Sequence, residues 1–158
     1  MSFQLSEQLD ADATSAFAFY KKYVENFKYK FPASVLAVLD SSNWYGGFDS
    51  KAPHDGVLKS VAIESIGTES SYIELLIAKP WANLNIRLRY KDIFDFNLPS
   101  MGSLAGTIEW RYEQFRYYDP YLAHKIENKK MFTHDIEWVG GTIWNITASD
   151  IEVEWINA

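Results

Sequence analysis

The chain has 158 residues, 47 % hydrophobic and 23 % charged, which is typical of a folded domain with its own core and excludes disorder as the main state. Its formal net charge of -6 disfavours nucleic acid as a ligand, because an acidic surface repels phosphates, and favours a basic protein partner. The absence of cysteine excludes disulfides, thiolate metal sites and cysteine nucleophiles.

The N-terminal residues 1–8 carry neither a basic cluster nor an apolar stretch of the kind found in secretory signals. No apolar run approaches the roughly 18 residues that would span a bilayer. We therefore expect a cytoplasmic protein that does not bind membranes.

The first expected element is a helix over residues 10–30, where apolar residues recur at helical spacing. Asp10 and Asp12 near its start and Lys28 and Lys30 at its end complement the helix dipole. A second, short helix is expected from Pro32 to Asp40, because proline is well tolerated at the first position of a helix. The residues of the apolar face of the first helix are Ala16, Phe17, Tyr20, Tyr23, Val24 and Phe27.

A turn-rich connector over residues 41–53 is followed by seven segments that favour strands. The clearest run, residues 84–90, alternates strictly between apolar and polar side chains, which places them on opposite faces of a sheet. Gly140 and Gly141 predict a tight hairpin, since a type I′ turn needs positive φ at both positions. The strand after residue 83 is expected to bend near Lys91 and Asp92. The expected strands are 57–66, 71–78, 83–96, 107–117, 131–139, 142–147 and 151–156.

These elements predict an α+β fold in one domain over residues 1–158, with a helical part over 1–45 and a sheet over 53–158. The N-terminal helix pair should pack on one face or end of a twisted, mainly antiparallel sheet of six or seven strands, which could curl into a partial barrel. The connectors at 99–106 and 118–130 are the longest in the sheet region and are candidate binding loops.

Two His-Asp pairs, His54-Asp55 and His134-Asp135, are the residues that most resemble metal ligands. A metal site needs three or four converging ligands, and the pairs lie far apart without a third spaced ligand. Strand alternation predicts that His134 is a hydrogen-bonded core residue, with a ligand or catalytic base as the alternative. Nucleophile-elbow and phosphate-loop motifs are also absent from the sequence, so we expect no catalytic residues, no metal and no cofactor.

Two pairs of carboxylates, Glu109 with Glu113 and Glu152 with Glu154, could in principle divide acid and base roles. Glu152 and Glu154 share a strand face opposite apolar residues, which favours a solvated outer surface over a catalytic pair.

Acidic residues accumulate towards the C-terminal strands. If those strands are neighbours, Asp135 and Glu137 could share a negative face with Glu152 and Glu154, which would steer and orient a basic partner. Protection of an edge strand against aggregation is the alternative explanation. The candidate partner-binding acids are Asp135, Glu137, Glu152 and Glu154.

Aromatic residues, 16 % of the chain, supply a second candidate surface. Trp110 and Tyr112 are expected on one face of their strand, with Phe115 and Tyr117 on the other. One set belongs to the core, and the other either packs under the helices, which we favour, or forms an exposed contact surface. The candidate partner-binding tyrosines are Tyr117, Tyr118 and Tyr121.

The stretch from His54 to Val61, HDGVLKSV, resembles the opening of a loose group of small, mostly uncharacterised bacterial β-rich domains. In that group a later segment reads like residues 110–115, WRYEQF, and a closing hairpin reads like residues 132–138, FTHDIEW. Some of its members look like immunity proteins encoded beside secreted bacterial toxins. The resemblance spans residues 53–155 and implies a fold more directly than a function.

We therefore expect a non-enzymatic protein-binding module, in particular an immunity protein that neutralises a cognate bacterial toxin by occupying a basic surface. The alternative is a small-molecule-binding or enzymatic β-barrel, with aromatics lining a cavity that contains His134 and a carboxylate. A structural subunit of a larger assembly is a third possibility. A deep pocket with His134 exposed at its base would favour the alternative, and a filled core with a flat acidic face the first expectation.

Overall fold

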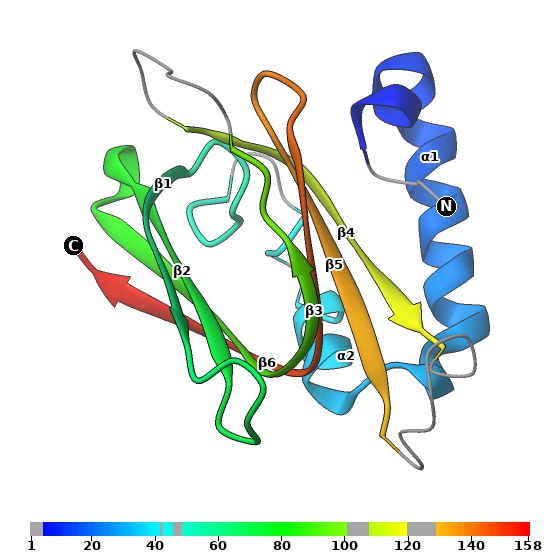
Figure 1. Cartoon of the computed structure of the whole chain (residues 1–158). Coiled ribbons are helices and arrows are strands. Elements are labelled where there is room, and N and C mark those ends of the chain that lie inside the picture. The colour runs from blue at the N-terminus through cyan, green and yellow to red at the C-terminus, as the bar shows by residue number, and fades with distance from the viewer. Residues whose placement is uncertain (1–4, 42, 46–48, 101–107, 120–128) are drawn as a thin grey trace.

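The computed structural model describes residues 5–41, 43–45, 49–100, 108–119 and 129–158, and shows an α+β fold in which helices pack against an antiparallel sheet (Figure 1). No helix in this described part of the chain is both long and apolar enough to cross a membrane. The helical elements are α1 (Ser6–Phe27), η1 (Lys28–Lys30), α2 (Ala33–Leu39) and η2 (Pro80–Ala82). The strands are β1 (Val57–Glu64), β2 (Tyr72–Lys79), β3 (Leu84–Asn97), β4 (Trp110–Tyr118), β5 (Met131–Trp138) and β6 (Ile143–Asn157).

Helix α1 consists of two helical segments joined at Asp12, where the backbone leaves the helical region (φ -160°, ψ 92°). The Asp12 carboxylate accepts hydrogen bonds from the backbone N–H of Ser15 (3.1 Å) and from its hydroxyl (2.7 Å), so it caps the longer second segment. The first segment, which the sequence did not predict, turns the start of the chain towards β4. Both expected helices are confirmed, the second as α2.

The six strands follow the order β1-β2-β3-β6-β5-β4, and every pairing is antiparallel. The expectation of separate strands at 142–147 and 151–156 is wrong, because both belong to β6. Its ladder with β3 continues through the intervening polar residues, where Lys91 pairs with Asp150 and the Ser149 hydroxyl donates to Asp92 (2.6 Å). Because residues 148–151 of β6 each keep a partner on β3, no turn interrupts the strand there.

Two features of the sheet geometry agree with the sequence. Gly140 and Gly141 both have positive φ, at 106° and 91°, in the hairpin between β5 and β6. Strand β3 bends at Asp92, whose φ is 56°, and its register with β6 shifts between Ile93 and Asp95. The bend lets the two halves of the sheet turn towards each other.

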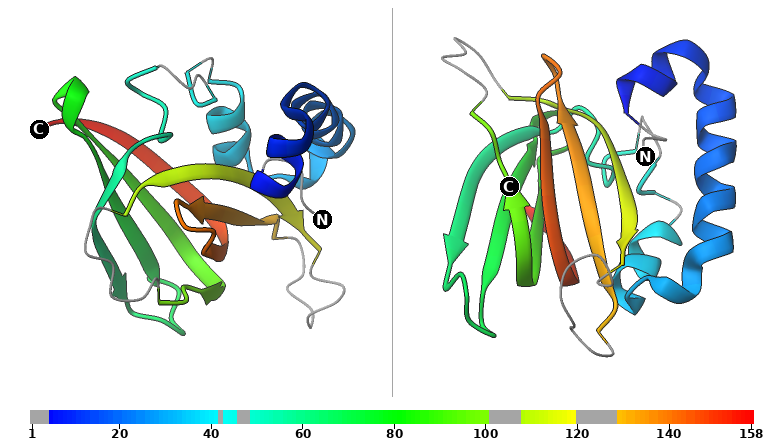
Figure 2. Two further views of the ribbon diagram at one scale, coloured as in Figure 1. Left: turned by 90° about the horizontal axis from the view of Figure 1, so that it is seen from above. Right: turned by 45° about the vertical axis from the view of Figure 1, so that its right-hand side comes forward.

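The sheet curls without closing into a barrel (Figure 2). Its edge strands approach at one place, where Val57 and Glu109 form an isolated antiparallel bridge. The Gly56 carbonyl accepts a hydrogen bond from the Trp110 N–H (2.8 Å) beside this bridge, and a Cβ at Gly56 would lie 2.3 Å from Cγ2 of Ile77 on β2, so only glycine fits here. Helix α1 runs beside the edge strand β4, and its N-terminal end lies near the region where the two edges come together.

The hydrophobic core lies on the inner face of the curled sheet. Ile73, Leu75 and Ile77 of β2 are fully buried opposite Tyr90, Leu88 and Ile86 of β3. Helix α2 packs against β6, and the Ser34 hydroxyl accepts a hydrogen bond from the Ile151 N–H (3.2 Å). Burial of each such apolar side chain stabilises the fold by about 1.5–3 kcal/mol. The core residues contributed from around α2 are Phe31, Val35 and Val38.

Aromatic residues of β4 pack under α1, as the sequence favoured. The Tyr23 ring stacks on Tyr117 with centroids 5.7 Å apart. The predicted separation of Trp110 from the Phe115 face is wrong, because the register of β4 with β5 shifts between Trp110 and Tyr112. Trp110 therefore lies in the core beside Trp138, with ring centroids 5.5 Å apart.

Candidate functional site

A pocket of about 320 Å³ lies where α1, the connector after α2 and the start of β4 meet. Its walls are formed mainly by apolar and aromatic side chains, with few polar groups. The volume falls within the range of pockets that hold small molecules. The described lining residues are Leu9, Ala13, Phe17, Trp44, Tyr45, Pro53, His54, Trp110, Arg111, Tyr112 and Glu113.

Glu113 is the only carboxylate among these lining residues, and it is 5 % exposed. It lies on the inner face of β4, the same face as Phe115, because side chains two positions apart on a strand point to the same side of the sheet. Its Oε1 accepts a hydrogen bond from the indole Nε1 of Trp44 (2.7 Å), and its Oε2 lies 2.7 Å from Nε2 of His134. The Tyr45 hydroxyl is a third hydrogen-bond partner. Three side chains from distant parts of the sequence therefore fix this carboxylate.

His134 lies behind Glu113 and is fully buried. Its ring stacks on Phe115, with centroids 3.9 Å apart and an interplanar angle of 12°. The second ring nitrogen, Nδ1, lies 2.7 Å from the Tyr90 hydroxyl. The prediction of a hydrogen-bonded core histidine is confirmed. The described residues contain no group of three His, Cys, Asp or Glu side chains arranged to hold a metal ion.

Three buried tyrosines that feel the Glu113 charge keep their hydroxyl protons. Burial raises the pKa of Tyr20, Tyr45 and Tyr90 well above the ordinary phenol value, and the negative charge of Glu113 raises these pKa values further. The buried Tyr90 hydroxyl needs an acceptor for its proton, and Nδ1 of His134 is the partner within reach. His134 is therefore the neutral tautomer that carries its proton on Nε2 and donates it to Glu113.

Glu113 consequently has only neutral hydrogen-bond partners: an indole, a phenol and a neutral imidazole. Arg111, the one permanently charged base among the described lining residues, pairs with other carboxylates. Its Nη2 lies 3.1 Å from Asp10 on α1, and its Nη1 lies 3.6 Å from Glu137 on β5. With His134 in this neutral tautomer, the pocket presents a buried carboxylate whose charge no described lining side chain balances.

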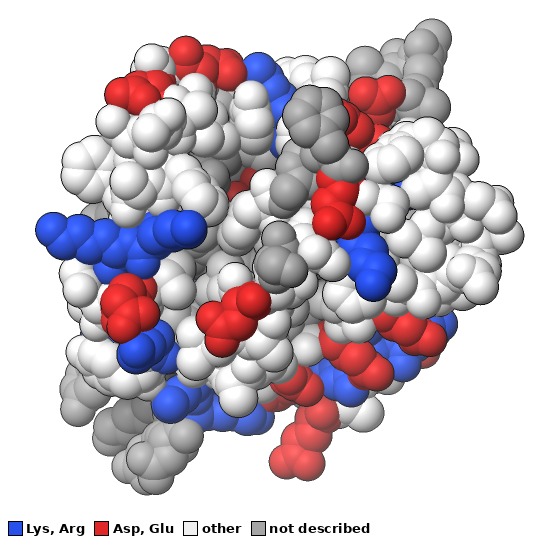
Figure 3. Space-filling model, turned by 180° about the vertical axis from the view of Figure 1, so that it is seen from behind, with Lys and Arg blue, Asp and Glu red and all other residues white. Residues whose placement is uncertain are grey.

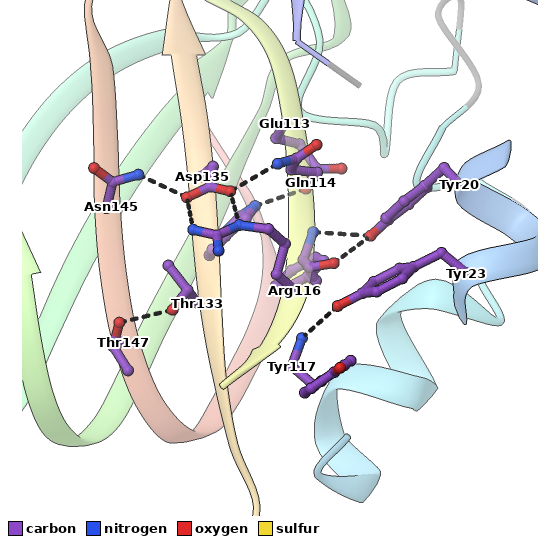
Figure 4. A network of polar contacts seen from close by, with 12 residues as sticks. Tyr20, Tyr23, Glu113, Gln114, Arg116, Tyr117, Thr133, Asp135, Asn145 and Thr147 are labelled. Atoms are coloured by element: carbon purple, nitrogen blue, oxygen red, sulfur yellow. Dashed lines mark hydrogen bonds and ion pairs between the residues drawn. The ribbon is translucent and has the colours of Figure 1, made fainter. Parts of the chain in front are cut away.

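A second polar cluster lies on the opposite face of the sheet, centred on Asp135 (Figure 4). Asp135 is 3 % exposed and accepts hydrogen bonds from Arg116 (2.5 and 2.9 Å), Gln114 (2.8 Å) and Asn145 (2.6 Å). Burial is the largest influence on the Asp135 pKa and raises it, but the hydrogen bonds and the Arg116 charge together outweigh burial and lower the pKa. This cluster is internally neutralised, unlike Glu113.

The structure does not bring the four candidate acids together on one exposed face. Asp135 and Glu137 are buried, and Asp135 pairs with Asn145 in the first half of β6. Glu152 and Glu154 lie in its second half, where they form ion pairs with Lys91 and Arg87. Figure 3 shows acidic and basic side chains interleaved over one side of the molecule. The role of these acids in partner binding stays a prediction.

The three candidate tyrosines have different environments. Tyr117 packs against Tyr23 and Phe27, and the Lys30 ammonium lies 4.5 Å from its ring centroid. Tyr118 contacts Phe94, with ring centroids 5.4 Å apart. Tyr121 lies outside the described residues.

The pocket itself was not predicted, because its walls come from three separate segments. One sequence signal pointed to it: Glu113 has the same strand parity as Phe115, which marks an ionisable residue on the buried face. No protein-family model matches the chain, and a search of curated proteins finds no match. Function is therefore inferred from the residues of the site.

Proposed function

We propose that this protein binds a small molecule in the pocket between α1, the connector and β4. The observation that carries the proposal is the buried Glu113 carboxylate at the wall of an otherwise aromatic pocket. Apolar walls with a few fixed polar groups are typical of ligand sites, where the walls supply affinity and the polar groups fix orientation.

The hydrogen bonds around Glu113 support binding by a preformed site. Trp44 of the connector and His134 of β5 each hydrogen-bond one of the two carboxylate oxygens. The stacked Phe115 ring fixes the plane of the His134 imidazole. A side chain fixed in this way loses little conformational entropy when a ligand arrives. Buried residues of the sheet, and not only the connector, therefore hold Glu113 in place.

The hydrogen bonds of Glu113 favour recognition over covalent chemistry. One carboxylate oxygen accepts from Trp44 and the other lies 2.7 Å from Nε2 of His134, so both are already held by the protein. We therefore propose recognition, without a chemical reaction, as the role of Glu113.

Ala13→Trp tests the pocket directly, because Ala13 is an exposed lining residue of α1 that a large side chain would turn into a plug. Ala11→Trp is the matched control on the same helix, outside the described lining. We expect a thermal-shift panel of neutral, anionic and cationic small molecules to stabilise the wild type and Ala11→Trp but not Ala13→Trp. A ligand at 100 times its Kd adds about 2.7 kcal/mol to the free energy of unfolding. If no compound shifts Tm, or if the plugged variant responds equally, the proposal is wrong.

The binding of a basic protein, such as a bacterial toxin, is a second proposal, and the exposed edge of β1 favours it. Residues 59–64 of this strand have no further strand neighbour in the described structure, and Val61 and Ile63 are 37 % and 42 % exposed. An edge of this kind can accept a strand from another protein, and the net charge of -6 favours a basic one.

Co-purification with the product of the adjacent gene tests this second function. We expect a complex at micromolar concentration that Val61→Lys weakens, because a lysine on an edge strand opposes strand addition and repels a basic partner. Ala13→Trp should leave that complex intact. Absence of a complex would remove this proposal and leave the pocket proposal in place.

A further inference from the structure

We infer that the ligand of this pocket is an organic cation of the alkylammonium or quaternary ammonium class. The inference rests on the proposed binding of a small molecule and specifies its chemistry. Two independent features of the pocket support it: a carboxylate without a counter-charge and walls made of aromatic rings.

The carboxylate supplies the first reason. Glu113 is buried, and its three hydrogen-bond partners are neutral groups. Burial of a charge without an opposite charge is unfavourable, because hydrogen bonds replace only part of the lost hydration. A cation in the pocket would supply the missing charge in a low-dielectric setting, where the attraction is stronger than in water. An anionic ligand would be repelled at the same place.

The aromatic walls supply the second reason. Rings from α1, the connector and β4 surround the space next to Glu113, and Phe17 and Tyr45 meet edge to face with centroids 5.9 Å apart. The face of an aromatic ring attracts a cation, and such cages recognise quaternary ammonium groups in other proteins. The rings that line the pocket belong to Phe17, Trp44, Tyr45, His54, Trp110 and Tyr112.

The rim of the pocket is compatible with entry of a cation. Arg111 is the one fully charged base in the described lining, and its guanidinium lies between Asp10 and Glu137 and 5.0 Å from the Tyr112 ring centroid. Two carboxylates therefore surround this single cation, and Glu113 adds a third negative charge. The resulting negative potential would attract cations towards the opening.

A metal ion fits this site less well than an organic cation. Calcium and magnesium take six or more oxygen ligands, and the described lining offers one carboxylate among aromatic rings. The aromatic rings can contact a methylated ammonium group directly. A hydrated metal ion would lose its water molecules in this pocket and gain too few oxygen ligands in exchange.

Calorimetric titration of the wild type with choline and with 3,3-dimethylbutan-1-ol tests the inference, because the two compounds share a shape and differ in the charged nitrogen. Butylammonium and benzyltrimethylammonium extend the test to other sizes of cation. We expect saturable binding of at least one cation and at least about tenfold weaker binding of the neutral isostere, a ratio that corresponds to about 1.4 kcal/mol. That difference lies within the range of cation–π and charge interactions in desolvated sites.

Glu113→Gln should weaken binding of the cation about tenfold or more, because it keeps the shape of the side chain and removes its charge. Glu109→Gln makes the same change in net charge on a residue outside the described lining and should leave affinity unchanged. Circular dichroism and thermal unfolding establish that each variant folds. If Glu113→Gln does not fold, Phe17→Leu removes one wall ring and should weaken choline more than its neutral isostere.

The outcomes separate the two proposals. If neutral or anionic members of the panel bind and none of the three cations does, or if Glu113→Gln binds the cation as well as the wild type does, the charge assignment is wrong and ligand binding stands. If no compound of any charge binds, both proposals fail. Preferential binding of a cation that Glu113→Gln weakens about tenfold or more and Ala13→Trp abolishes supports both.

Discussion

The phenol oxygen of Tyr20 bonds to both backbone groups of Phe115: it accepts a hydrogen bond from the N–H (2.8 Å) and donates one to the C=O (3.0 Å) (Figure 4). Phe115 lies on β4, an edge strand that has no second strand neighbour at this residue within the described part of the chain. Tyr23, one helical turn further along α1, accepts a bond from the Tyr117 N–H (3.1 Å). Two tyrosines of a helix thereby take the place of a missing strand and protect this edge from pairing with another chain.

Tyr20→Phe should destabilise the fold, because it leaves the buried N–H and C=O of Phe115 without their partner. Each unsatisfied buried backbone group costs about 1–3 kcal/mol, so for the two groups we expect a loss of about 2–6 kcal/mol in the free energy of unfolding measured in urea. Tyr29→Phe is the matched control, since Tyr29 is 64 % exposed and should tolerate the change. Equal stability of the two variants would contradict the bridging role.

The hydrogen-bond chain from Tyr90 through His134 to Glu113 fixes one tautomer of the imidazole. We expect nitrogen NMR to show a protonated Nε2 and an unprotonated Nδ1, since the Tyr90 hydroxyl donates to Nδ1. Tyr90→Phe removes this donor and should reduce the free energy of unfolding by about 1–2 kcal/mol. A protonated Nδ1 in the wild type would overturn the proton assignment on which the neutral environment of Glu113 depends.

Asp135 should make the fold sensitive to acid. Its pKa is lowered in the folded state, because its hydrogen bonds and the Arg116 charge outweigh the opposing effect of burial. A lowered folded-state pKa contributes stability that is fully present above the unfolded value, about 3.9, and is lost as the pH falls through the folded value. The wild type should therefore lose stability as the pH is lowered below about 4.

Asp135→Asn tests this linkage, because it removes the titrating group and breaks the buried pair with Arg116. At pH 7 we expect a loss of about 3–5 kcal/mol, as is usual when one partner of a buried ion pair is removed. Urea unfolding at pH 7 and at pH 3 should show that the difference from the wild type shrinks in acid. Glu154→Gln, at an exposed ion pair with Arg87, should cost less than about 1 kcal/mol. An undiminished gap between wild type and Asp135→Asn at pH 3 would rule out this role of Asp135.

Local sequence patterns determined the kinds of elements and several of their details. Alternation over residues 84–90 predicted a strand, and the Gly140-Gly141 pair predicted a tight turn. The position of His134 in its alternating segment predicted a core residue. The structure confirms all three. These features depend on backbone geometry and on side chains within a few positions along the chain. They could therefore be predicted without knowledge of how the strands pair.

The tertiary structure decided which polar side chains are buried and where the pocket lies. Asp135 was expected on an exposed face but is enclosed by Arg116 and its neighbours, and Glu113 gained its role only when Trp44 and His134 were brought to it. Burial and charge balance depend on strand order, register and the elements that cover each face, which are contacts between residues far apart in the sequence. A carboxylate on an alternating strand can be solvated, paired or left as a site for a cation, and only the surrounding fold selects among these states.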